Sequence, residues 1–113
     1  MGDRISIQFV KEEQLSVVLC SHWRGKDFLK DVKKYLKGLG KTETKLYPLD
    51  RREPQTIMVD FVRYLTKDLQ RVDSDLYFGF NKNDVDNSDN GHFYIDLKTG
   101  KILEEHEFIA RVL

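Results

Sequence analysis

Two spacings of apolar residues divide the first half of this chain into strands and helices. Apolar and polar residues alternate from residue 4 to residue 9, and this period of two predicts a half-buried strand. A polar turn over residues 11–14 and a second apolar run over residues 15–20 complete a predicted hairpin. Over residues 25–39 and 54–69 the apolar side chains recur on one side at helical spacing, so we expect two amphipathic helices.

The second half returns to strand patterns. Residues 76–80 and 92–97 predict two strands, separated by a loop rich in Asp and Asn over residues 81–91. A turn at 98–101 leads to a short strand at 102–103, and residues 105–113 fit either a strand or a helical turn. The order is ββααββ, so we expect an α+β fold with an antiparallel sheet of four to five strands. Both helices should cover one face, leaving the other solvated or open to a partner, with Tyr77, Tyr94 and Val18 pointing that way.

Composition fits one compact domain over residues 1–113. Apolar residues make up 40% of the chain, which suffices for a core, and 19 basic residues balance 19 acidic ones. A single cysteine, Cys20, fits a reducing compartment. No apolar run reaches the roughly 18 residues of a membrane span, and the N-terminus lacks the apolar core of a signal peptide. We expect a cytoplasmic protein that does not contact membranes.

The junction between the second strand and the first helix carries the most distinctive side chains. His22, Trp23 and Arg24 lie between an apolar run and Gly25. One hypothesis is a ligand pocket, with an indole wall, a titratable imidazole and the free N–H groups of the following helix. The other is structural: Trp23 covers the edge of the core and His22 bridges backbone groups. The structural hypothesis predicts that Trp23→Ala destabilises the fold more than His22→Ala.

Three short segments in this order resemble a group of small uncharacterised phage and prokaryotic proteins. The matching segments are Ser21-His22-Trp23-x-Gly25, the second-helix stretch 61–65 (Phe-Val-Arg-Tyr-Leu), and residues 89–96 from Asp89-Asn90 to Tyr94-Ile95-Asp96. The group has a His-Trp-x-Gly strand-to-helix junction and no assigned activity. The resemblance implies one compact domain and no mechanism.

Catalytic and metal sites have only partial signatures. An enzyme would centre on His22 with an acidic partner such as Asp89 or Asp96, or on the pair Cys20 and His22. Residues 86–91 match the opening of a calcium loop, but position twelve is Leu97 where a Glu belongs, so we expect weak calcium binding or none. The three histidines lack zinc spacing. We expect no metal and no cofactor.

Charge is distributed unevenly along the chain. Residues 24–52 hold ten basic and four acidic residues, whereas residues 68–113 hold five and ten. Lysines of the first helix, opposite its apolar side, would allow weak nucleic-acid binding; these are Lys26, Lys30, Lys33, Lys34, Lys37 and Lys41. The pattern favours a protein-binding or regulatory module whose partner is another protein or a second copy, with enzyme and nucleic-acid binder as alternatives. The candidate site residues are His22, Trp23, Arg24, Arg63, Asp89 and His92.

Overall fold

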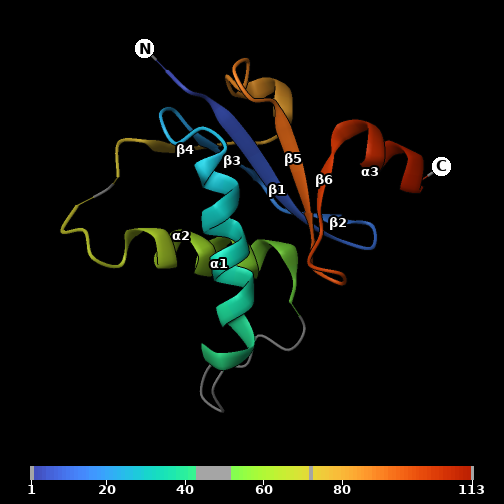
Figure 1. Ribbon diagram of the computed structural model, residues 1–113, viewed down its shortest axis with the longest axis horizontal. Helices are drawn as coiled ribbons and strands as arrows, with labels where there is room; N and C mark the ends of the chain where they lie inside the picture. Colours follow the sequence, from blue (N-terminus) through green and yellow to red (C-terminus); the bar gives the residue numbers. More distant parts are fainter. Residues whose placement is uncertain (1, 43–51, 72, 113) are drawn as a thin grey trace.

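The computed structural model describes residues 2–42, 52–71 and 73–112 of the chain. Within these ranges the chain forms six strands, three α-helices and one 3₁₀ turn (Figure 1). In chain order they are β1 (Ile5–Lys11), β2 (Gln14–Leu15), β3 (Val18–Ser21), α1 (Asp27–Thr42), α2 (Pro54–Thr66), β4 (Leu76–Gly79), the 3₁₀ turn η1 (Lys82–Asp84), β5 (His92–Asp96), β6 (Ile102–Glu104) and α3 (Glu105–Val112).

The strands form one mixed sheet in the order β4–β3–β1–β5–β6, with β2 paired to the end of β1. The predicted N-terminal hairpin is confirmed, since β1–β3 is antiparallel, and the predicted turn at 98–101 joins antiparallel β5 and β6. The central pair β1–β5 is parallel, with Ile7 opposite Phe93, so the prediction of a wholly antiparallel sheet of four to five strands is wrong. A turn fixes the direction of the two strands it joins. Strands β1 and β5 are separated by most of the chain, and no local pattern sets their relative direction.

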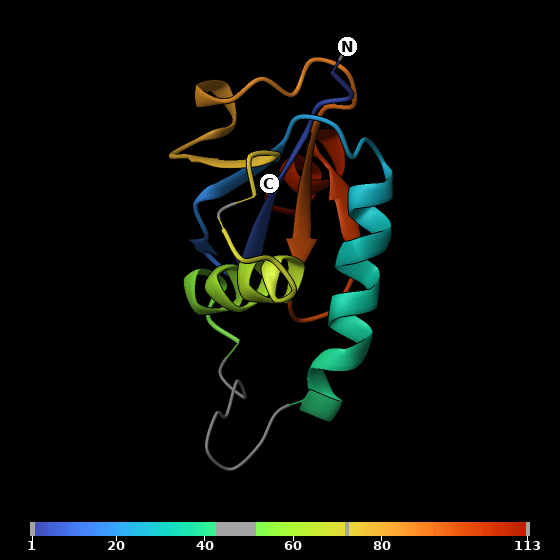
Figure 2. The same cartoon turned by 90° about the vertical axis from the view of Figure 1, so that its left-hand side faces the viewer.

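Helices α1 and α2 cover the same face of the sheet, as predicted (Figures 1 and 2). Alternate β1 residues, among them Ile7 and Phe9, enter a core with Phe28 of α1 and Phe61 of α2. The Phe61 ring lies 5.5 Å from the Phe9 ring and 5.2 Å from the Tyr35 ring, between centroids. One face of β1 and the apolar sides of α1 and α2 therefore meet in one apolar layer. The prediction that this strand is half-buried is wrong, because Ser6, Gln8 and Val10 on its other face are buried as well.

The helix ends differ from the predicted ones. Helix α1 continues through Gly38 to Thr42, and α2 ends at Thr66. Leu69 therefore lies in the segment that returns from α2 to β4 instead of in the helix. The predicted polar connection over residues 41–53 falls largely outside the described residues.

The opposite face of the sheet is covered instead of open. Residues 105–112 form α3, and the Phe108 ring stacks on Tyr94 of β5 with centroids 4.0 Å apart. An ion pair between Lys82 of η1 and Glu105 joins the loop after β4 to this helix. Val18 and Tyr94 face this side as predicted, but both are buried. The expectation of two helices and a solvated second face is therefore wrong, because a third helix, the short amphipathic α3, packs on this face.

None of the helices in the described ranges is long and apolar enough to cross a membrane.

A candidate binding groove beside strand β4

Strand β4 is an edge of the sheet, and among the described residues it pairs with β3 alone. The amide of His22 donates to the carbonyl of Asp75 at 3.0 Å, which extends the β3–β4 ladder by one pair. Hydrogen-bonded and non-bonded pairs alternate along antiparallel strands. Tyr77 and Gly79 therefore turn their backbone groups toward β3, while Phe78 turns its N–H and C=O to the open edge.

The neighbours of Phe78 on this edge have partners for their amides. Leu76 donates its N–H to the carbonyl of Asp73 at 3.2 Å. Phe80 donates its N–H to Asp84 Oδ2 at 3.1 Å. The edge is thus capped at both ends and open at Phe78.

An apolar groove of about 510 Å³ lies between β4 and the C-terminal end of α2. It borders the β4 side of the molecule that faces the viewer in Figure 2. Its lining is mostly apolar, with Arg71 and Asp73 as its charged members, and its apolar members are Leu19, Val62, Leu69, Leu76 and Phe78. A second hollow of about 340 Å³, lined by Val17, Phe78, Gly79, Phe80 and Asp84, shares Phe78 with the first. Together they border the whole length of β4.

Large apolar side chains beside this groove are exposed to solvent. Phe78 is 56% exposed, Phe80 88% and Leu69 48%. Phe78 points to the side of the sheet that carries α2, since it lies opposite core residue Leu19, and Phe80, just beyond the end of β4, lines the second hollow with it. Exposed apolar groups that gather at a strand edge mark an interaction site or an aggregation liability.

The strand-to-helix junction flanks β4 on the opposite face of the sheet. The His22 ring stacks on Tyr77 with centroids 4.7 Å apart, and the Trp23 ring follows at 5.5 Å. Trp23 is 58% exposed, so the structural hypothesis that it covers the core is wrong. A turn after Ser21 directs the indole outward, and Phe28 fills the core below instead.

The buried carboxylate of Asp75 holds the junction to the start of β4. Its Oδ2 accepts the Ser21 hydroxyl at 2.8 Å and lies 2.8 Å from Arg24 Nε, while its Oδ1 accepts the Trp23 amide at 2.8 Å. Arg24 also meets Asp73 at 2.7 Å. Arg24 therefore connects the junction to the segment that begins β4. The sequence pattern did not predict a role for Asp75.

Gly25 ends the junction in a conformation that few other residues adopt. Its φ is +56°, and a Cβ there would lie 2.0 Å from a carboxylate oxygen of Asp3. Its amide donates to the Asp3 carbonyl at 2.9 Å. The glycine thus allows β3 to turn tightly past the N-terminal segment into α1.

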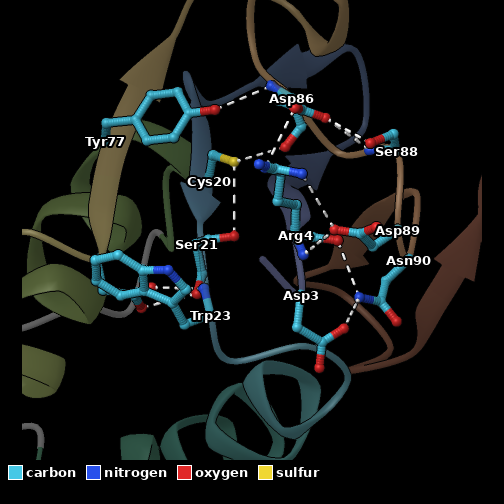
Figure 3. Close-up of polar contacts among 11 residues, drawn as sticks. Asp3, Arg4, Cys20, Ser21, Trp23, Tyr77, Asp86, Ser88, Asp89 and Asn90 are labelled. Atoms are coloured by element: carbon cyan, nitrogen blue, oxygen red, sulfur yellow. Dashed lines mark hydrogen bonds and ion pairs between the residues drawn. The ribbon is translucent and has the colours of Figure 1, made fainter. Parts of the chain in front are cut away.

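Asp89 belongs to a different cluster, drawn in Figure 3. Its Oδ2 accepts the Arg4 amide at 2.9 Å, and the Arg4 guanidinium lies 3.2 Å from Asp86 and 3.6 Å from Asp89. Two hydrogen bonds from Ser88 lower the pKa of Asp86. In Figure 3, Arg4 and Cys20 lie between Trp23 and this loop. The carboxylates proposed for calcium are turned toward Arg4, and no hydrogen bond or ion pair joins Asp89 to His22.

His92 lies on β5 within a buried polar chain. Gln8 Nε2 donates to the Ser16 carbonyl, so Gln8 Oε1 accepts from His92 Nε2 at 2.9 Å. His92 Nδ1 is left to accept from the Ser6 hydroxyl, 2.6 Å away. Burial lowers the pKa of His92 to about 4, with a smaller contribution from Lys82. The ring is therefore neutral at neutral pH and fully hydrogen-bonded.

The other candidate residues, catalytic or binding, also have structural partners. Cys20 is buried, and its thiol lies 3.2 Å from the Asp86 carbonyl; burial raises the pKa of this thiol, which weakens it as a nucleophile. Asp96 forms an ion pair with Arg111. Arg63 meets Asp60 at 3.0 Å on the outer side of α2, away from the junction.

Two charged features remain on the surface. Glu104, His106 and Glu107 place one ligand atom each within 4.8 Å of one another, all exposed, and Glu107 already accepts the Glu104 amide at 3.0 Å. Lys26, just before α1, is exposed, and so are four lysines of α1, as expected for its outer side; they are Lys30, Lys33, Lys34 and Lys37.

Comparisons of the chain with protein-family models, with curated proteins and with solved structures found no match. The functional argument therefore rests on the structure itself. Of the predicted site residues, the structure groups His22, Trp23 and Arg24, and places Arg63, Asp89 and His92 elsewhere. The groove residues Leu69, Phe78 and Phe80 were missed. The available signal was the mostly apolar run over residues 76–80. It did not reveal an exposed edge strand, because such a run fits a central strand equally well.

Proposed function

We propose that this chain is a protein-interaction module that binds an extended protein segment along β4. The observation that carries the proposal is the open backbone of Phe78 beside an apolar groove and two exposed phenylalanines. Strand addition at a sheet edge gains affinity from main-chain hydrogen bonds and specificity from pockets for alternate side chains. Both parts are present at β4, where the groove lies on the side to which residues 76 and 78 point.

The titratable side chains support a binding role over a catalytic one. Cys20 and His92 are buried and hydrogen-bonded, and Arg24 is held by aspartates. The exposed part of the junction offers aromatic rings, Trp23 and half-buried His22 and Tyr77. Aromatic residues are common at the centre of protein interfaces.

The test is a selection of displayed ten-residue peptides against the immobilised chain, followed by affinity measurement on the enriched peptides. Leu69→Lys places a charge beside the groove. Ile109→Lys is its matched control on α3, because Ile109 is 46% exposed and Leu69 48%. We expect at least a tenfold loss of affinity for Leu69→Lys and none for Ile109→Lys. Failure of a monomeric chain to enrich any peptide, or equal losses in both variants, contradicts the proposal.

A further inference from the structure

We infer that the segment bound along β4 is β4 of a second copy of this chain, related by a two-fold axis at Phe78. This inference rests on the proposed function and names its partner. A two-fold interface uses the same surface on both copies, so that surface must complement itself. The β4 edge meets this condition in its backbone, its side chains and its charges.

The backbone of Phe78 is self-complementary. Its N–H and its C=O both face the open edge, whereas the amides of Leu76 and Phe80 already have acceptors. When two antiparallel copies meet at this residue, each Phe78 donates to the other and accepts from it. The pairing adds hydrogen bonds at Phe78 alone, because the Leu76 and Phe80 amides keep their acceptors within the chain.

The same register brings an exposed side chain to the groove. With Phe78 opposite its counterpart, Phe80, which directly follows β4, lies toward the Leu76 end of the other copy's strand. Leu76 lines the groove of about 510 Å³, and Phe80 is 88% exposed. An exposed apolar ring of one copy thus comes near the apolar groove of the other, and burial of apolar surface drives association.

Exposed side chains of opposite charge lie beyond the two ends of β4, with Asp73 beside Arg71 in the groove. Exposed Arg71 lines the groove beside Leu69, and exposed Asp84 lies at the Phe80 end. A two-fold axis at Phe78 brings Arg71 of one copy toward Asp84 of the other, and the reverse. The chain has a formal net charge of zero, so long-range repulsion does not oppose pairing of two copies.

Sedimentation equilibrium over increasing concentration tests the association. The monomer has a mass of 13.4 kDa. We expect a reversible dimer whose dissociation constant rises at least tenfold in Phe80→Lys and stays unchanged in Ile109→Lys. Circular dichroism of both variants checks that they fold. A dimer that Ile109→Lys disrupts and Phe80→Lys does not overturns the inference.

Cross-linking tests the register. Directly opposite hydrogen-bonded residues have Cα atoms about 5.5 Å apart, within the range of about 4.4–6.8 Å that a disulfide spans. In a Cys20→Ala background, Phe78→Cys should form a covalent dimer on mild oxidation. Phe80→Cys alone should not, because the two positions lie about 13 Å apart along the strands. Cross-linking of Phe80→Cys alone and not of Phe78→Cys contradicts the register.

The two proposals fail separately. A chain that stays monomeric at every concentration, but binds selected peptides in a manner sensitive to Leu69→Lys, overturns the second copy as partner and keeps the docking edge. A monomeric chain that binds no peptide overturns both.

Discussion

The two edges of the sheet have different surroundings. At the β6 edge, the Glu104 amide is bonded to Glu107, and a hollow of about 460 Å³ has Glu104, Glu105 and His106 in its lining. At the β4 edge, a groove of about 510 Å³ is mostly apolar, and Phe78 leaves its backbone open. Hollow size does not separate the two edges, whereas the lining does, since by the same alternation Ile102 of β6 also turns its backbone groups to its edge. Charged side chains protect strand edges from pairing, so the β6 edge is protected and the β4 edge is available.

The largest effect that we predict is a pH dependence of the free energy of unfolding. It comes from His92 on β5, the neighbour of β6, on the face that α3 covers. Burial lowers the pKa of His92 from 6.5 to about 4. The folded state therefore resists a proton that the unfolded state accepts, and stability is full above about pH 6.5 and falls toward pH 4. The loss over that window is about 3 kcal/mol. Urea unfolding at several pH values measures it.

His92→Gln is the control for this pH dependence, since glutamine does not titrate. Its stability should be nearly constant between pH 6.5 and 4, whatever its absolute value. Asp86 and Asp96 have lowered pKa values, so their stabilising contributions are lost below about pH 4, outside this window. Equal slopes in wild type and His92→Gln would show that His92 is not the group responsible.

On the β4 side, the buried group that we expect to stabilise the fold is the Asp75 carboxylate. Asp75→Ala should lower the free energy of unfolding by about 2–3 kcal/mol, because it leaves the Ser21 hydroxyl, the Trp23 amide and one Arg24 contact without an acceptor. Asp31→Ala is a matched control. Asp31 contacts the same arginine at 3.7 Å but is more exposed, so we expect a loss below about 0.5 kcal/mol. Similar losses for both variants would argue against Asp75 as the anchor of β4.

The smallest effect that we predict is the change in the free energy of unfolding when Trp23 is replaced. Trp23 lies at the margin of the proposed binding region beside β4. Its side chain is 58% exposed, so Trp23→Ala should change the free energy of unfolding by about 0.5 kcal/mol or less. This replaces the expectation from sequence that Trp23→Ala is the more destabilising change at the junction. A loss of about 3 kcal/mol in urea unfolding, typical of a buried tryptophan, would restore the structural hypothesis.

Sequence periodicity predicted the elements better than their arrangement. Alternation at Ile5, Ile7 and Phe9 and the helical spacing around Phe28 and Phe61 identified the core layer, because burial imposes those periods. The parallel β1–β5 pairing and the cover by α3 depend on contacts between distant segments.

The candidate site was predicted in part. The junction at His22 and Trp23 stood out by residue type, and it flanks β4. Phe78 and Phe80 did not stand out, because an apolar strand residue becomes a surface feature only when its strand lies at an edge. Asp75 was missed for a related reason: its partners Ser21 and Arg24 are about fifty residues away along the chain.

The most direct test of the difference between the edges is hydrogen–deuterium exchange followed by peptide analysis. Exchange would be measured well below and well above the dimer dissociation constant found by sedimentation. The account predicts that the peptide containing residues 76–80 exchanges more slowly at high concentration, because the Phe78 amide gains an acceptor, while the peptide containing residues 102–104 does not change. Slower exchange at 102–104 with no change at 76–80 would contradict it.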